Sequence, residues 1–99
     1  DGSLAGADRE KATALKLALR LNLAACALRS SRHAEALSHC DAALALSPAS
    51  SKALFRRGQA LVGLGELGEA EAAFESVLTV QPTNKEAHAQ LAKLRQQTA

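Results

Sequence analysis

Large aromatic and β-branched side chains are scarce in this 99-residue chain. It has no Trp, Tyr or Ile, and its only aromatic residues are Phe55 and Phe74, yet hydrophobic residues make up 47% of it. A core built mainly from Ala and Leu favours closely packed helices, because these residues form helices readily and strand-forming residues are few. The sequence therefore predicts an all-α fold with one small core.

Clustered charge and long apolar runs are also lacking. The formal net charge is only +2 and the basic residues are spread along the chain, which disfavours binding to nucleic acid or to an anionic membrane surface. No apolar stretch approaches the roughly 20 residues that span a bilayer. The two cysteines, Cys26 and Cys40, lie inside helical patterns and are expected to be buried and reduced, which favours a cytoplasmic location.

Motifs for catalysis and metal binding are missing as well. The potential metal ligands lack the paired spacing of zinc sites; they are Cys26, His33, His39, Cys40 and His88. No phosphate-binding loop, dinucleotide fingerprint or nucleophile motif occurs. We therefore expect no metal, no cofactor and no enzymatic activity in this segment.

What the chain does contain is an internal repeat with a period of about 34 residues. Pro48 and Pro82 stand at this separation. Other matches at the same offset are Glu35 with Glu69, Ala36 with Ala70, Leu44 with Leu78, Ala24 with Gly58, and Cys40 with Phe74. This period is typical of helix-turn-helix units that stack into a solenoid.

Helical spacing and turn signals divide the chain into a flexible lead-in and three units. The predicted boundaries are 1–7 for the lead-in, 8–50 for a first repeat with an extended first helix, 51–84 for a second repeat, and 85–99 for a capping helix. The corresponding helices are predicted near 8–30, 34–46, 51–64, 68–80 and 84–97. Asp8 is a candidate N-cap, and Thr83 with Glu86 has the spacing of a capping box.

The unit at 51–84 resembles a tetratricopeptide repeat. Gly58, Ala70, Phe74 and Pro82 match the small, small, aromatic and proline positions of that family. In the first unit Cys40 stands where the aromatic residue is expected. The resemblance implies a solenoid of antiparallel helix pairs, here two repeats and a C-terminal capping helix.

Two strings carry a more specific resemblance. L-N-L-A-A-C at 21–26 and K-A-L-F-R-R-G at 52–58 are similar to the repeats of FK506-binding immunophilin co-chaperones. In that group these segments belong to the last two of three repeats. The resemblance therefore implies that the first repeat, and any prolyl isomerase domain, lie outside this chain.

The same resemblance implies a binding mechanism. Asn22, Lys52 and Arg56 match three of the five positions of a carboxylate clamp, which docks the C-terminal Glu-Glu-Val-Asp tail of Hsp90 or Hsp70. Lys52 and Arg56 share one helix face, and Asn22 lies one repeat period before Arg56, on the preceding repeat. Other positions that line the groove in this group are Ala25, Phe55 and Gln59. Phe55 suits a core position equally well.

An alternative is a structural or scaffolding repeat that uses another surface or self-associates. In this group the first helix packs against an upstream repeat, which would leave Leu15, Leu19 and Ala27 partly bare. Exposed apolar surface favours association, so a homodimer through the first helix is a second hypothesis.

Overall fold

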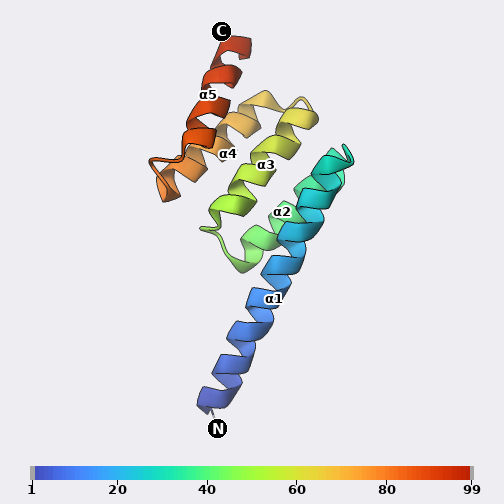
Figure 1. Ribbon diagram of the computed structural model, residues 1–99, viewed down its shortest axis with the longest axis vertical. Coiled ribbons are helices and arrows are strands. Elements are labelled where there is room, and N and C mark those ends of the chain that lie inside the picture. The colour runs from blue at the N-terminus through green and yellow to red at the C-terminus, as the bar shows by residue number, and fades with distance from the viewer. Residues whose placement is uncertain (1, 99) are drawn as a thin grey trace.

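The computed structural model describes residues 2–98, and side chains within 8–97. The helices are α1 Gly2–Arg29, α2 His33–Leu46, α3 Ser51–Gly63, α4 Leu67–Val80 and α5 Lys85–Thr98, and the described residues form no strand (Figure 1). The all-α prediction is confirmed, and the four later helices begin and end close to their predicted positions.

The helices stack in chain order. α1 packs on α2, α2 on α3, α3 on α4 and α4 on α5, and α1 also contacts α3. Figure 1 shows two antiparallel pairs followed by α5, with the first half of α1 extending past the stack. This arrangement is a short solenoid in which each unit buries the apolar face of the next.

Both repeats reverse direction through the same turn. Ser31 and Gly65 stand one repeat period apart and both have positive φ, 57° and 79°. In each turn the next amide donates to a carbonyl five residues earlier, at 2.8 and 2.9 Å. This pattern ends a helix with one left-handed residue, which glycine adopts most easily.

Two N-caps are also equivalent. Ser50 Oγ accepts a hydrogen bond from the Ala53 amide at 3.2 Å, and Asn84 Oδ1 accepts one from the Ala87 amide at 2.9 Å. The capping box predicted at Thr83 is therefore wrong by one residue. Both residue types cap helices well, and Asn84 is the one that reaches the third amide of α5.

The first helix is longer than predicted, because it begins at Gly2. Asp8 lies inside α1 and does not cap it, so that prediction is wrong. The lead-in at 1–7 was expected to be flexible. The side chains of these residues are not among those that the structure describes.

The core of the second repeat is centred on Phe74, which is completely buried. A Cβ added to Gly58 would lie 2.6 Å from the Phe74 ring, so the missing side chain of Gly58 makes room for this residue. α5 closes the core with Ala87, Leu91 and Leu94, which form the buried stripe expected of the capping helix.

Burial on α1 differs from two expectations. Ala27 is only 1% exposed, because it packs with Ala36 and Ala60, so the prediction of a bare Ala27 is wrong. Cys26 is exposed, contrary to prediction, while Cys40 is buried as predicted, and both are free thiols. Leu15 and Leu19 are exposed as expected, by 73% and 56%.

Candidate functional site

A hollow of about 410 Å³ opens between α3 and the start of α5. It contains both charge signs, several amides and one aromatic ring. The lining residues are Ser51, Lys52, Phe55, Arg56 and Gln59 from α3, Gln81 and Asn84 from the α4–α5 loop, and Glu86 from α5. An open, amphipathic hollow of this kind suits a peptide segment.

Four of the six residues expected to bind a peptide line this hollow: Lys52, Phe55, Arg56 and Gln59. They come from one face of α3, at the i, i+3, i+4 and i+7 spacing that places helical residues side by side. The other two, Asn22 and Ala25, lie on α1 and do not line the hollow. Asn22 is exposed and Ala25 is partly buried.

Arg56 links this face of α3 to α1. Its Nη1 donates a hydrogen bond to the Leu21 carbonyl oxygen at 3.0 Å, directly before Asn22 in the chain. Arg56 is partly buried, and one contact leaves other guanidinium donors for a ligand. The guanidinium therefore lies between the hollow and the part of α1 that carries Asn22.

Phe55 both supports the core and faces the hollow. Its ring packs edge to face on Phe74, with centroids 5.2 Å apart and planes at 66°, and it packs against the core cluster while lining the hollow. Contact with buried Phe74 fixes the ring without removing it from solvent. The two interpretations of Phe55 left open by the sequence are therefore compatible.

Lys52 and Arg57 have different surroundings. Lys52 is exposed and, among the described side chains, has no hydrogen bond or ion pair. Arg57, directly after Arg56 in the chain, instead donates to Asp41 of α2 at 2.9 Å and does not line the hollow. Lys52 is thus available to a ligand, and Arg57 is engaged elsewhere.

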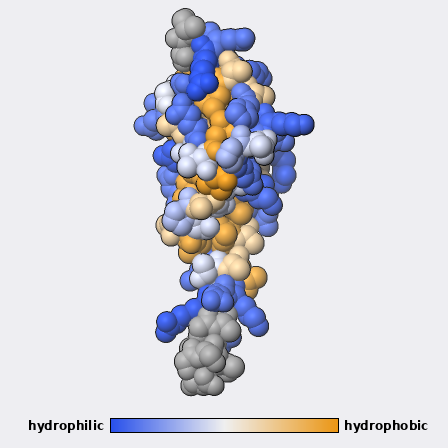
Figure 2. All heavy atoms as spheres, turned by 90° about the vertical axis from the view of Figure 1, so that its left-hand side faces the viewer, coloured by the Kyte–Doolittle hydropathy of each residue, from blue (hydrophilic) through white to orange (hydrophobic). Residues whose placement is uncertain are grey.

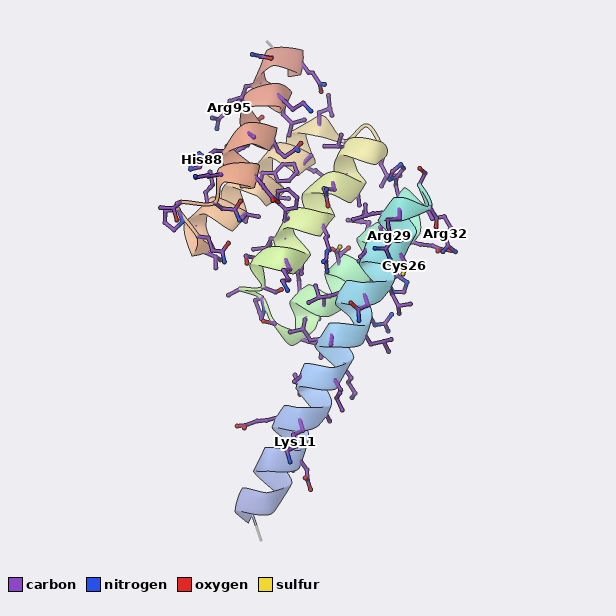
Figure 3. The ribbon with its side chains drawn as sticks, viewed as in Figure 1. Lys11, Cys26, Arg29, Arg32, His88 and Arg95 are labelled. Carbon is purple, nitrogen blue, oxygen red and sulfur yellow. The ribbon has the colours of Figure 1, made fainter. Side chains whose placement is uncertain are left out.

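The loop that forms the other wall is held by local hydrogen bonds. Asn84 Nδ2 donates to Gln81 Oε1 at 3.0 Å, and His88 Nε2 donates to the Pro82 carbonyl oxygen at 2.8 Å. Figure 3 shows His88 on α5 beside this loop. Sequence reasoning missed this wall, although the repeat offset that relates Lys52 to Glu86 was a usable signal.

Cys40 lies behind the basic residues of α3. Burial and the neighbouring Asp41 carboxylate raise the pKa of its thiol to about 11, with Arg56 and Arg57 opposing this rise. A thiol with such a pKa stays protonated near neutrality and is a poor nucleophile and metal ligand. Its position suits a structural role.

No three His, Cys, Asp or Glu side chains among the described residues are grouped so that they could hold a metal ion. None of the helices described is long and apolar enough to cross a bilayer.

The fold, the repeat and the turn geometry define a class of helical repeat protein. A tetratricopeptide repeat family model matches residues 27–94. The chain belongs to the tetratricopeptide repeat family, whose fold serves protein–protein interaction.

Curated relatives refine this assignment. The chain is 42% identical over 96 residues to the peptidyl-prolyl cis-trans isomerase FKBP4 of Bos taurus, and 35% identical over 94 residues to FKBP42 of Arabidopsis thaliana. These alignments cover 97% and 95% of this chain but only 21% and 26% of the relatives. The resemblance to FK506-binding immunophilins is confirmed for the repeat region.

Solved structures show the same fold. The first repeat domain of Spaghetti (RPAP3), bound to the HSP90 peptide SRMEEVD, is 38% identical with a TM-score of 0.81, covering 83% of this chain and 65% of that one. The second repeat domain of human RPAP3, in complex with the HSP70 peptide SGPTIEEVD, is 39% identical with a TM-score of 0.77, covering 80% and 66%.

Proposed function

We propose that this chain is a non-enzymatic docking module that binds the acidic Glu-Glu-Val-Asp tail of a cytoplasmic Hsp90 or Hsp70 chaperone. Asn22, Lys52 and Arg56 act as a partial carboxylate clamp, and Ala25, Phe55 and Gln59 contact the rest of the peptide. The observation that carries the proposal is that Lys52 and Arg56 line one hollow beside Phe55.

The chemistry of this face matches the end of such a tail. A terminal Asp presents two carboxylates, which accept charge-assisted hydrogen bonds from an ammonium and a guanidinium. Lys52 is free to turn toward a ligand, and the contact of Arg56 with Leu21 directs its guanidinium toward α1. The Asn22 amide, on that helix, then completes a set of three donors.

Support also comes from the peptides that related domains bind. Two structures similar to this chain, at 38% and 39% identity, hold peptides that end in Glu-Glu-Val-Asp. Three clamp residues in place of five give a weaker complex. Two missing charge-assisted hydrogen bonds, at about 1.5–3 kcal/mol each, correspond to about two to four decades of affinity.

Peptide titration followed by NMR tests this proposal. A peptide ending in Glu-Glu-Val-Asp should shift the amide signals of Asn22, Lys52, Phe55 and Arg56. Lys52→Ala should weaken binding by about 1.5–3 kcal/mol, and amidation of the peptide terminus should weaken it comparably. Higher salt should also reduce affinity, because exposed charges are screened within about 10 Å at 0.1 M.

Arg57→Ala is the matched control, since it removes a neighbouring guanidinium that pairs with Asp41. It should leave peptide affinity nearly unchanged. Arg56→Ala should abolish measurable binding, and its thermal stability must be compared because it also removes the contact with α1. Binding that survives both Lys52→Ala and terminal amidation would refute the clamp.

We also propose self-association as a second role, with another copy of the chain as the partner. Leu15 and Leu19 on α1 are exposed, and Leu19 borders a hollow of about 360 Å³ that also contains Ala42 and Leu46. Lys16 and Arg20 rim this hollow. Apolar surface exposed on α1 in this way favours pairing of this helix with the α1 helix of a second copy.

A further inference from the structure

The hollow beside α3 has opposite charges on its two walls. Lys52 stands on α3 and Glu86 stands one repeat period later, at the equivalent position of α5, and both line the hollow. Arg56 strengthens the positive wall, whereas Gln90, its counterpart on α5, is neutral. The side chains on this face are therefore neutral on α1, where Asn22 lies, positive on α3 and negative on α5.

Glu86 is available to a ligand. It is exposed and, among the described side chains, takes part in no hydrogen bond or ion pair, although the hollow also contains Lys52. Glu71 and Glu75, by contrast, both pair with Arg95 across α4 and α5. An unpaired anion and an unpaired cation in one hollow suit a ligand that carries both charge signs.

The backbone below Glu86 is held firmly. Asn84 caps α5 and hydrogen-bonds Gln81, while Ala87 and Leu91, on either side of the next turn, are completely or almost completely buried. A Glu in the first turn also favours the helix dipole. The interaction with the helix dipole does not require the Glu86 side chain to line the hollow, so it does not account for the position of Glu86 in the wall.

The distance between the walls selects a position in the peptide. Packed helices lie about 8–10 Å apart. α1 and α3 pack directly, whereas α3 and α5 face each other across the hollow with fewer contacts, so the path from the gap between α1 and α3 to α5 is at the upper end of one and a half spacings, about 15 Å. An extended peptide advances about 3.3 Å per residue. A tail whose last residue is held by Asn22 and Arg56 thus reaches α5 with the residue four or five places before its end.

We propose that Glu86 makes this groove selective for acidic-tailed peptides that carry a basic residue four or five places before the C-terminus. This inference rests on the proposed docking function. The preferred ligand is a tail whose acidic end meets Lys52 and Arg56 and whose basic side chain meets Glu86. Tails with a further acidic residue at that place are disfavoured, because like charges repel across the open hollow.

The peptide SRMEEVD, which has Arg five places before its last residue, and its variant SQMEEVD form a matched pair. At low salt the native chain should bind SRMEEVD about two to five times more tightly, as expected of an exposed charge pair. In Glu86→Gln this ratio should fall close to one, mainly through weaker binding of SRMEEVD. SEMEEVD should bind the native chain more weakly than SQMEEVD and should recover in Glu86→Gln.

Glu69→Gln is the control, because Glu69 is an exposed carboxylate of α4 outside the hollow. It makes the same change in net charge and should keep the native ratio. If the ratio is the same in Glu86→Gln as in the native chain, while both peptides still depend on Lys52, the inference about Glu86 is wrong and the docking function stands. If neither peptide binds, or if Lys52→Ala leaves peptide affinity unchanged, the proposed docking function is wrong and the inference about Glu86 is wrong with it.

Discussion

In each repeat, two buried residues on neighbouring helices have sizes that complement each other. The second repeat combines Gly58 with Phe74, and the first has Ala24 and Cys40 at the equivalent positions, all four buried. A larger residue on one helix thus accompanies a smaller one on the next. Close packing of this kind leaves little tolerance for a change on one side only.

Gly58→Ala should destabilise the protein. The new Cβ would lie 2.6–2.9 Å from the buried Phe74 ring, and such overpacking costs about 1–3 kcal/mol, which exceeds the gain of about 1 kcal/mol in helix propensity. Urea unfolding should show a net loss of about 1 kcal/mol. In the Phe74→Leu background the same substitution should cost less, and equal costs in both backgrounds would contradict this account.

The two thiols should differ in reactivity. Cys26 is exposed, whereas Cys40 is buried with a pKa of about 11. At pH 8 a thiol reagent should modify Cys26 rapidly in the folded chain and should reach Cys40 only after denaturation. Two thiols reacting at similar rates in the folded state would show that Cys40 is accessible.

The raised pKa of Cys40 also affects stability at high pH. An unfolded thiol ionises near pH 9, and the folded one near pH 11. The stabilisation of the folded state by the Cys40 thiol is therefore complete below pH 9. It is lost as the pH rises toward 11, because only the unfolded state releases the thiol proton in this range. Cys40→Ala should remove this part of the pH dependence of the unfolding free energy.

At the scale of elements, equivalent helices are one repeat period apart, but the residue types at their ends differ. Ser50 and Asn84 cap equivalent helices with different side chains, and Ser31 and Gly65 end equivalent helices with different residues. The two repeats thus share a geometry although the residue types differ. A substitution that copies one repeat into the other is a direct test of this equivalence.

Ser31→Gly should stabilise the chain by about 0.5–1 kcal/mol, because a φ of 57° is unfavourable for a residue with a side chain and is acceptable for Gly. Thermal unfolding should therefore shift upward. Ser30→Gly is the control, since the Ser30 amide still donates to the Cys26 carbonyl as in a helix, and Gly there should bring no gain. A lower stability for Ser31→Gly would contradict this prediction.

The sequence predicted the helices because the repeat period and the apolar spacing report directly on packing. It misjudged features that depend on neighbours. Cys26 fits the helical apolar pattern of α1, yet it lies on a face of α1 that the other described helices leave exposed, and Figure 3 shows it with Arg29 at the far side of the molecule from α5. Ala27 is buried by Ala36 and Ala60, which only the helix crossing reveals.

The candidate site was predictable only on the α3 side. Lys52, Arg56, Phe55 and Gln59 follow from one helix face, whose geometry the sequence determines. The opposite wall depends on where the α4–α5 loop and α5 lie, so Glu86 was not foreseen although its repeat position is readable.

At the scale of the whole molecule, the exposed leucines of α1 predict concentration-dependent association. Figure 2, which faces the left-hand side of Figure 1, shows hydrophobic atoms exposed along the stacked helices as well, bordered by hydrophilic atoms. Leu15→Glu with Leu19→Glu should keep the chain monomeric, whereas the native chain should show a larger mass in light scattering as concentration rises. A strictly monomeric native chain up to millimolar concentration would rule out this dimer.

The stacking of helices in chain order has a mechanical consequence. Apart from the contact between α1 and α3, the main packing contacts among the described helices join helices that are neighbours in the chain, so none of these helices holds the two ends of the stack together. A force that pulls the termini apart loads these interfaces one after another instead of shearing them all at once. Under tension the chain should therefore peel from its ends, one helix at a time, and yield at low force.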